Sequence, residues 1–254
     1  RAGAVDPRPV HLQLSISENE TLQLSNQGGL AISRDGSTIV YRTVNRLYLR
    51  RLDREDVVPI AGTERAAHPF FSPDGRWIGF FSDGKLKKVS VDGGMPVSVA
   101  DCPDARGAAW SDDGTIVFTN GVVGGLVRVP EGGGPPVTLT TPDSSKEERT
   151  HRWPSVVPGG ETVIFTVGTQ ESPDYYEDAT IEAVKTATGE RTTLIRGASS
   201  AVYISSGHLL YSRSGVLYAV PFDPDDAVVT GAPIPVVQRV TGDPTTGAMN
   251  YAVS

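Results

Sequence analysis

Serine and aspartate, two residue types that can take part in catalysis, recur in this chain in one fixed pattern. The motif Ser-x-Asp-Gly begins at Ser33, Ser72 and Ser111, and successive copies lie 39 residues apart. The aspartates could form a ring of carboxylates, or each could accept hydrogen bonds from the backbone of its own turn. We favour the second interpretation, which gives a structural role to Ser33, Asp35, Gly36, Ser72, Asp74, Gly75, Ser111, Asp113 and Gly114.

The other reactive side chains show no spacing typical of a catalytic or metal site. They are His11, His68, His151, His208 and the single cysteine, Cys102. No two histidines stand four residues apart, as they do on the helix of a zinc protease. No basic residue adjoins the cysteine to activate its thiolate. The acidic run 223–226 lacks the glycine and the distal glutamate of an EF-hand calcium loop.

Signatures of several enzyme classes are also missing from the sequence. A sialidase repeat places one residue between its aspartate and its glycine, whereas the two are adjacent here. The Gly-x-Ser-x-Gly nucleophile elbow of α/β-hydrolases does not occur, and neither do the glycine-rich loop, the His-Arg-Asp loop and the Asp-Phe-Gly segment of protein kinases. We therefore predict a segment without catalytic residues, metal or cofactor.

Composition and charge argue against two classes of partner. The chain of 254 residues has a net charge of −7 and a pI near 5.1, whereas a nucleic-acid-binding domain usually carries a basic patch and a high pI. No apolar run approaches the roughly 18 to 20 residues of a membrane span. The chain begins without a methionine or the apolar core of a signal peptide. We expect residues 1–9 to be a linker tail and the chain to be a fragment or a mature form.

Short strands must position these groups, because apolar runs and turn signals alternate around the second motif. Pro-Asp-Gly, Asp-Gly and Asp-Gly-Gly each favour a tight turn, and no helical period is present. The predicted strands lie at 68–72, 76–82, 85–91 and 96–100. A repeat of this length indicates a repeat architecture, and four strands per repeat are typical of a blade of a β-propeller.

The predicted fold is therefore all-β, a propeller of four-stranded blades. We expect a single domain over residues 10–254 with about six blades, the last of them incomplete. Five blades are expected near 28–62, 66–100, 105–141, 150–195 and 200–238. The segments 10–16 and 249–254 would each contribute a strand to the incomplete sixth blade, since propellers commonly close with strands from both chain ends.

A family resemblance follows from these repeats. The stretch FSPDGRWIGFFSDGKLKKVSVDGGMPVSV resembles the TolB-type, WD-repeat-like propeller repeat. The stretches RGAAWSDDGTIVF, GGLVRVPEGGGPPVTLT and HRWPSVVPGGETVIFTV are similar to the C-terminal propeller of bacterial, eukaryotic-like serine/threonine protein kinases. The resemblance covers nearly the whole chain, from about residue 10 to residue 254.

In that kinase family the propeller follows a kinase domain and a membrane-spanning helix. The resemblance implies a non-catalytic sensor or interaction module, on the extracytoplasmic side of a bacterial membrane, that binds a protein or a small ligand. Two alternatives stay open: a free periplasmic TolB-like scaffold, and an accessory propeller of a peptidase or other hydrolase. A cytoplasmic location is a further alternative. We expect no nucleic-acid partner and no membrane insertion by this segment, although the parent protein could be membrane-anchored.

The propeller also predicts one candidate binding site. The first strand of each blade lines the central channel, so the residues just before it ring a channel mouth. Counting four to six residues back from each motif serine, or its equivalent, selects His68, Arg106, His151, Arg152, Trp153 and Asn250. On an acidic protein this candidate channel rim could bind an anionic group or a peptide carboxylate. The same side chains could instead pack between blades and bond loop carbonyls.

Overall fold

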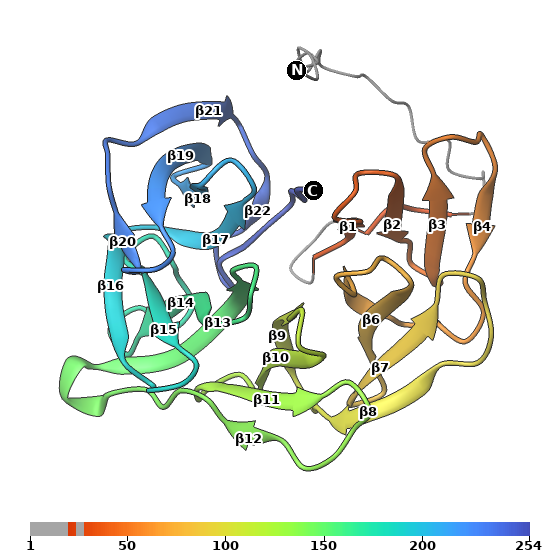
Figure 1. Ribbon diagram of the computed structural model, residues 1–254, viewed down its shortest axis with the longest axis horizontal. Coiled ribbons are helices and arrows are strands. Elements are labelled where there is room, and N and C mark those ends of the chain that lie inside the picture. The colour runs from red at the N-terminus through yellow and green to blue at the C-terminus, as the bar shows by residue number, and fades with distance from the viewer. Residues whose placement is uncertain (1–19, 24–27) are drawn as a thin grey trace.

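Five antiparallel sheets follow one another along the chain and surround a common centre, as the blades of a propeller do (Figure 1). The computed structural model describes residues 20–23 and 28–254. Within these residues the only helical element is one 3-10 turn, Ser144–Lys146. The prediction of an all-β propeller with four-stranded blades is therefore confirmed.

The first three blades each contain four strands in simple up-and-down order. Blade one consists of β1 (Leu30–Ile32), β2 (Thr38–Arg42), β3 (Leu47–Arg51) and β4 (Val57–Pro59). Blade two consists of β5 (Ala67–Phe71), β6 (Trp77–Ser82), β7 (Lys85–Ser90) and β8 (Val97–Asp101). Blade three consists of β9 (Ala105–Trp110), β10 (Thr115–Asn120), β11 (Leu126–Pro130) and β12 (Val137–Thr138).

The next two blades have longer strands, and a small extra sheet follows them. Blade four consists of β13 (Glu148–Val156), β14 (Thr162–Thr169), β15 (Thr180–Lys185) and β16 (Arg191–Arg196). Blade five consists of β17 (Ser199–Ile204), β18 (His208–Arg213), β19 (Val216–Asp223), β20 (Val228–Val229) and β21 (Ile234–Gln238). The extra sheet is a hairpin of β22 (Gly242–Asp243) and β23 (Ala248–Met249).

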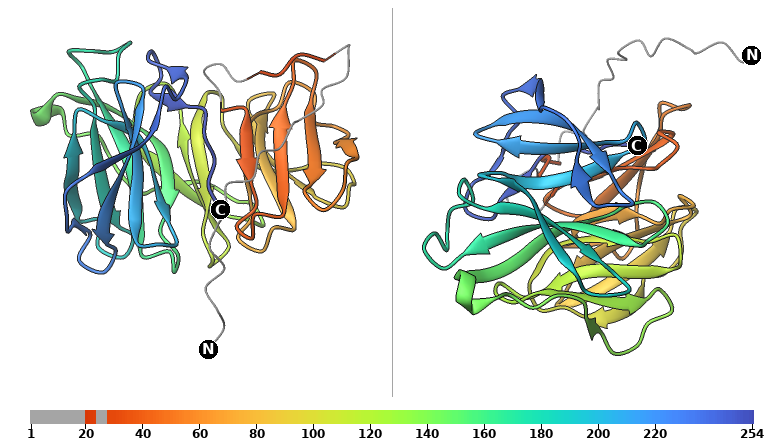
Figure 2. Two further views of the ribbon diagram at one scale, coloured as in Figure 1. Left: turned by 90° about the horizontal axis from the view of Figure 1, so that it is seen from above. Right: turned by 60° about the vertical axis from the view of Figure 1, so that its left-hand side comes forward.

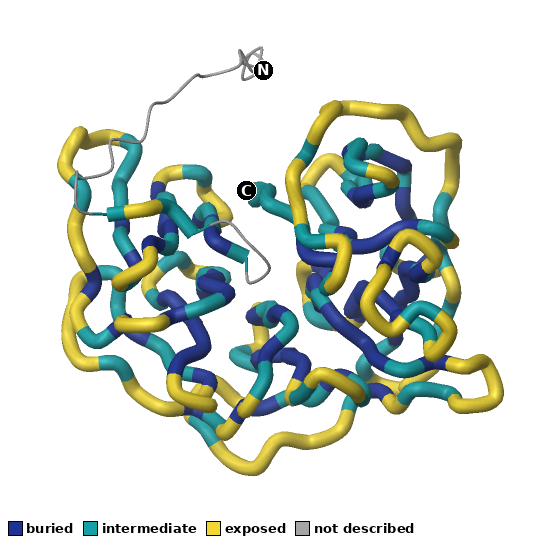
Figure 3. Tube along the Cα trace, turned by 180° about the vertical axis from the view of Figure 1, so that it is seen from behind, coloured by how far each residue is buried: buried dark blue, intermediate teal, exposed yellow. Residues whose placement is uncertain are grey.

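The apolar core lies between neighbouring blades rather than in one central mass. Four buried clusters join blade one to two, two to three, three to four and four to five. In the cluster of blades two and three, Phe81 packs against Phe118 with ring centroids 6.2 Å apart. Burial of one such side chain stabilises a fold by about 1.5–3 kcal/mol. The outer turns stay exposed (Figure 3), so face-to-face packing of the sheets holds the ring together.

The inner strands β5, β9, β13 and β17 share one irregularity, a β-bulge at the same place in each blade. The pairing of β5 with β6 shifts between Ala67 and Phe70, and equivalent shifts occur in the other three strands. One residue at each bulge has a positive φ: His68 (49°), Gly107 (91°), Trp153 (53°) and Ser200 (58°). A bulge redirects the side chain at its position, and these four residues all line the centre of the ring.

Both chain ends were predicted to contribute to a sixth blade. The predicted linker 1–9 and the predicted strand 10–16 lie outside the described residues. At the other end, β23 pairs with β22, and residues 250–254 form no strand. This C-terminal segment lies between blade five and blade one (Figure 2). The Tyr251 hydroxyl donates a hydrogen bond to the Ser200 carbonyl. Five blades and a small extra sheet are consistent with the predicted count of about six.

Candidate functional site

Two cavities, which share part of their walls, lie at the centre of the ring. The larger has a volume of about 580 Å³ and the smaller about 250 Å³. Each of the five inner strands contributes to both, through Ile32, Phe70, Ala108, Pro154 and Val202. The larger cavity lies at the end of the ring that carries the Ser-x-Asp-Gly turns, and it is called here the Arg34 cavity after the cation at its edge.

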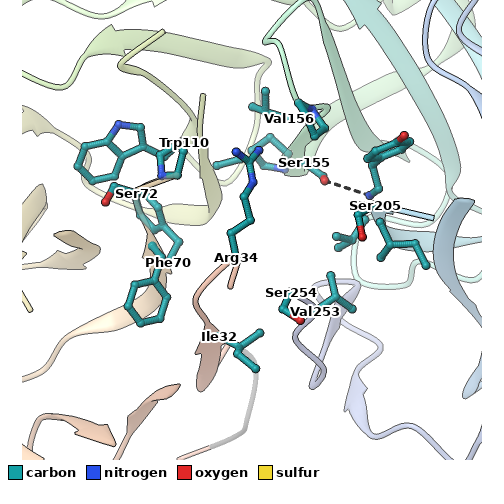
Figure 4. A pocket seen from close by; sticks show the side chains of 18 of the residues that line it. Ile32, Arg34, Phe70, Ser72, Trp110, Ser155, Val156, Ser205, Val253 and Ser254 are labelled. Atoms are coloured by element: carbon teal, nitrogen blue, oxygen red, sulfur yellow. Dashed lines mark hydrogen bonds between the residues drawn. The ribbon is translucent and has the colours of Figure 1, made fainter. Parts of the chain in front are cut away.

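Arg34 extends from blade one into the group of residues that line this cavity (Figure 4). Its Nη1 lies 2.7 Å from Oδ1 of Asp112, in the turn of blade three. Oδ2 of Asp112 also accepts a hydrogen bond from the Gly159 backbone N–H of blade four, at 3.0 Å. The hydrogen bonds from Arg34 and Gly159 hold the pKa of Asp112 below its usual range. One carboxylate therefore links blades one, three and four next to Arg34.

The wall of the Arg34 cavity combines polar groups with apolar and aromatic side chains. It includes Phe70, Phe71, Trp110 and Tyr203. The Trp110 ring is fixed by a hydrogen bond of 3.0 Å from its Nε1 to Oε2 of Glu131. Arg34 and Asp35 are the two charged residues among the described residues that line it. Such a site can bind an apolar group and, next to it, an anion.

The nine residues predicted to form turns lie at this end of the ring. Ser33 Oγ donates to Asp35 at 2.5 Å, and Ser72 Oγ donates to Asp74 at 2.6 Å. Asp113 accepts from the backbone N–H of Thr115 at 2.9 Å. The hydrogen bonds from these serines, together with those from Ser37 and Arg76, lower the pKa values of Asp35 and Asp74 to about 2. The φ angles of Gly36, Gly75 and Gly114 are 71°, 69° and 78°. The aspartates are thus bonded to their own turns.

His68 and Trp153 of the predicted channel rim lie together at the other end of the channel. Their ring centroids are 5.2 Å apart, and both line the smaller cavity. Burial, with the nearby charges of Arg106 and Arg42, lowers the pKa of His68 to about 3, so the ring is neutral at pH 7. Trp153 Nε1 donates to the carbonyl of Thr246, in the β22–β23 hairpin, at 2.8 Å. The hairpin therefore borders this end.

His151 lies inside the protein rather than at a channel mouth, with none of its surface exposed. Its Nδ1 is 2.7 Å from Thr140 Oγ1, and that hydroxyl already accepts a bond from the Leu126 backbone N–H. The Glu148 carboxylate can only accept, so Nε2–H of the neutral ring donates to it at 3.1 Å. Nδ1 is then the acceptor, and the Thr140 hydroxyl donates to it. Burial lowers the pKa of His151, although the bond to Glu148 opposes this shift.

Arg152 is also buried, with 2% of its surface exposed. Its guanidinium donates to the carbonyl of Val122 at 2.8 Å and lies 4.8 Å from the centre of the Tyr176 ring. Burial lowers the pKa of Arg152 to about 10. Arg106 is half-buried and ion-paired with Asp104.

Asn250 bonds within the hairpin region, since its backbone N–H donates to the Thr241 carbonyl at 2.9 Å and its side-chain amide donates to the Thr241 hydroxyl at 3.3 Å. Of the six rim candidates, the structure brings only His68 and Trp153 to the central cavities. Both stand four residues before the motif serine or its equivalent, where the bulge is. Arg106 and Arg152 stand five residues before it, and their side chains point elsewhere because direction alternates along a strand.

Sequence reasoning missed Arg34 and Asp112. One signal could have found them, because both occupy the variable second position of a Ser-x-Asp-Gly motif and carry opposite charges.

No family model matches the sequence, and no curated protein matches it. Among solved structures, the chain resembles a putative TolB from Agrobacterium tumefaciens, with 14% identity, 89% of each chain covered and a TM-score of 0.62. It resembles TolB from Acinetobacter baumannii with 16% identity and a TM-score of 0.63, over 89% of this chain and 56% of that one. Virginiamycin B lyase from Staphylococcus aureus matches with 14% identity and a TM-score of 0.55, over 88% of this chain and 76% of that chain.

The neighbours therefore include TolB proteins and an enzyme, and their low identity carries information about fold only. Among the described residues, no group of three or more His, Cys, Asp or Glu side chains could hold a metal ion. The part of the chain that the structure describes also contains no helix long and apolar enough to cross a membrane. The likeness to solved structures shows that this chain has the β-propeller fold of the TolB-type structures.

Proposed function

We propose that this chain is a non-catalytic interaction module that binds an extended polypeptide segment in the Arg34 cavity. The segment would place an acidic side chain against Arg34 and an apolar side chain against the wall formed by Phe70, Phe71 and Tyr203. The observation that carries the proposal is the cavity itself. Its volume is about 580 Å³, aromatic side chains form one part of its wall, and the Arg34 guanidinium extends into it.

The inner strands favour a polypeptide as the ligand. Each of β1, β5, β9, β13 and β17 is the end strand of its sheet, so it pairs with one other strand of that sheet. Part of the remaining edge is already bonded, because Gly124 bridges to Thr150 in β13 and the Tyr203 N–H in β17 donates to Ser155. The rest of the edge offers backbone N–H and C=O groups toward the centre. An extended peptide can pair with such an edge, while pockets for its side chains give specificity. Aromatic side chains next to placed polar groups are common in ligand sites.

A library of hexapeptides with free composition at each position tests the proposal. The immobilised chain should enrich peptides in which Asp or Glu neighbours Phe, Tyr or Leu. The variant Arg34→Ala should lose this enrichment, because the charge-assisted hydrogen bond is worth about 1.5–3 kcal/mol. The matched control is Arg51→Ala, since Arg51 forms a similar exposed ion pair with Asp92, at 3.0 Å, in a different cavity. Absence of enrichment, or equal enrichment by Arg34→Ala, would contradict the proposal.

We also propose that the module belongs to a receptor-type serine/threonine protein kinase and lies on the extracytoplasmic side of a bacterial membrane. The sequence resemblance to kinase C-terminal propellers supports the first part, and the TolB-type fold supports the second. Sequencing the encoding gene across both ends of this chain tests the parent. A kinase domain and a membrane helix upstream are expected. A signal peptide with a separate α/β domain upstream would favour the free TolB-like scaffold instead.

A further inference from the structure

We propose that Asp112 is a specificity-determining residue of the Arg34 cavity, acting as an internal competitor that a ligand carboxylate must displace. This inference rests on the proposed function, because it assumes that Arg34 receives the acidic group of the ligand. Asp112 stands 78 positions from Arg34 in the chain, and the ion pair reaches from blade one to blade three.

The geometry makes the Asp112 carboxylate a mimic of a ligand carboxylate. Both terminal nitrogens of the Arg34 guanidinium face the Asp112 carboxylate, with Nη1 at 2.7 Å from Oδ1 and Nη2 at 3.4 Å from Oδ2. This two-point arrangement is the one that guanidinium prefers with any carboxylate. A ligand carboxylate that enters the cavity would seek the same two nitrogens.

Asp112 keeps its place when Arg34 turns away. The Gly159 N–H bonds Oδ2 from the turn of blade four, independently of Arg34. The carboxylate is therefore positioned by the ring and does not need the guanidinium to orient it. When a ligand carboxylate takes Arg34, Asp112 loses its ion pair but keeps the hydrogen bond from the Gly159 N–H. Water can solvate its other oxygen.

Exposure makes the exchange easy. The side chains of Arg34 and Asp112 are 51% and 37% exposed, and such pairs shift an equilibrium by about fivefold at most. The pair of Arg191 with Glu148 shows the contrast, because its side chains are only 18% and 5% exposed. The exposed pair can open for a ligand, whereas the buried one would leave a charge without a partner.

Competition with Asp112 would also make the cavity selective for carboxylates over neutral amides. A neutral amide gains little at Arg34, because it would replace a charged partner with a weaker acceptor. A ligand carboxylate replaces the Asp112 carboxylate with an equivalent partner for Arg34. Burial of the apolar group of the ligand then adds to the binding free energy. The site should therefore discriminate carboxylates from isosteric amides, and removal of Asp112 should strengthen carboxylate binding.

The experiment compares 1-naphthylacetate with the neutral 1-naphthylacetamide, by calorimetry or saturation-transfer NMR, on the folded chain. Wild type, Asp112→Asn, Arg34→Ala and the double variant are titrated, and Asp92→Asn is the control because it removes a similar exposed carboxylate outside the channel. Asparagine keeps an acceptor for the Gly159 N–H. Thermal unfolding checks that each variant is folded, and Asp112→Ser serves as a second replacement.

The expected result is a Kd for naphthylacetate about two- to fivefold lower in Asp112→Asn, with no change for naphthylacetamide or in Asp92→Asn. This gain should vanish in the Arg34→Ala background, since the cycle isolates the coupling of the two residues. If Asp112→Asn binds naphthylacetate equally or more weakly while Arg34→Ala loses binding, Asp112 is no competitor but the proposed function stands. If Arg34→Ala binds as wild type does, both proposals are wrong.

Discussion

His68 and Trp153 meet across the centre of the ring, with centroids 5.2 Å apart and planes inclined by 57°, although they belong to blades two and four. Blade three contributes Gly107 between them. A Cβ atom at that position would lie 2.8 Å from Cε3 of Trp153. The contact of the two rings therefore depends on the absence of a side chain in the blade that separates them.

The first prediction concerns this glycine. We expect Gly107→Ala to lower the free energy of unfolding by about 2–5 kcal/mol, because a positive φ costs about 1–2 kcal/mol and overpacking about 1–3 kcal/mol. Gly93→Ala is the control, since its φ of 98° is close to the 91° of Gly107 but no atom lies within 4 Å of the added Cβ. Denaturant unfolding gives both values. Equal losses in the two variants would show that the Trp153 contact is unimportant.

The second prediction separates structure from binding at Arg152. We expect Arg152→Ala to lower the free energy of unfolding by about 2–5 kcal/mol, since it empties a buried site and removes the hydrogen bond to the Val122 carbonyl. Binding of 1-naphthylacetate at the Arg34 cavity should not change. Arg149→Ala is the control on the same strand, because its exposed guanidinium bonds only the Pro173 carbonyl among the hydrogen bonds described. An Arg152→Ala variant that is as stable as wild type but binds 1-naphthylacetate more weakly would show that Arg152 belongs to the binding site.

The third prediction is a pH dependence that originates at Glu148. Burial alone would raise the pKa of this carboxyl, but hydrogen bonds from His151 and Arg191 outweigh burial and hold it at about 2. A depressed pKa means that the ionised form stabilises the fold above the ordinary value of 4.5 and that this contribution is lost as pH falls from 4.5 toward 2.

Unfolding free energies between pH 7 and pH 2 test this expectation. Glu148→Gln should be less stable than wild type at pH 7, and its stability should fall less steeply below pH 4.5. Glu161→Gln, at an exposed position on the same blade, should follow the wild-type curve. Parallel curves for wild type and Glu148→Gln would mean that another titrating group, such as buried His68, dominates the acid transition.

The fourth prediction distinguishes turn aspartates from a carboxylate ring. We expect Asp74→Ala to lower the free energy of unfolding by about 1–2 kcal/mol, because Ser72 Oγ and the Arg76 N–H lose an acceptor. Calcium should leave the melting temperature of wild type unchanged. A calcium-dependent rise in melting temperature that Asp74→Ala abolishes would instead support a ring of carboxylates.

The fold could be predicted because its signals are local. Each turn sequence carries its own conformational preference, and Asp83 and Gly84 adopt the positive φ angles, 55° and 71°, that an Asp-Gly hairpin turn requires. The spacing of 39 residues then repeats the same unit. No long-range information is needed to recognise a blade, since sequential strands pair with one another.

The site was harder to predict because it depends on single-residue offsets and on contacts between blades. Because of the bulge, the side chain four residues before the motif serine, His68, enters the channel, whereas the one five residues before it, Arg106, does not. The residue types alone do not predict the bulge. The partners of His151 and Arg152 come from loops at Thr140 and Val122. Arg34 and Asp112 meet only when the ring is assembled.

The repeated bulge gives each of blades two to five one position that faces the channel. Each of blades two to five presents one residue at its bulge to the centre, and that residue lies outside the clusters that hold the blades together. His68, Gly107, Trp153 and Ser200 therefore determine which groups face this end of the channel, and three of them are coupled, because His68 touches Trp153 and Gly107 leaves room for it. A redesign of the channel interior would therefore have to exchange these residues as a set rather than one at a time.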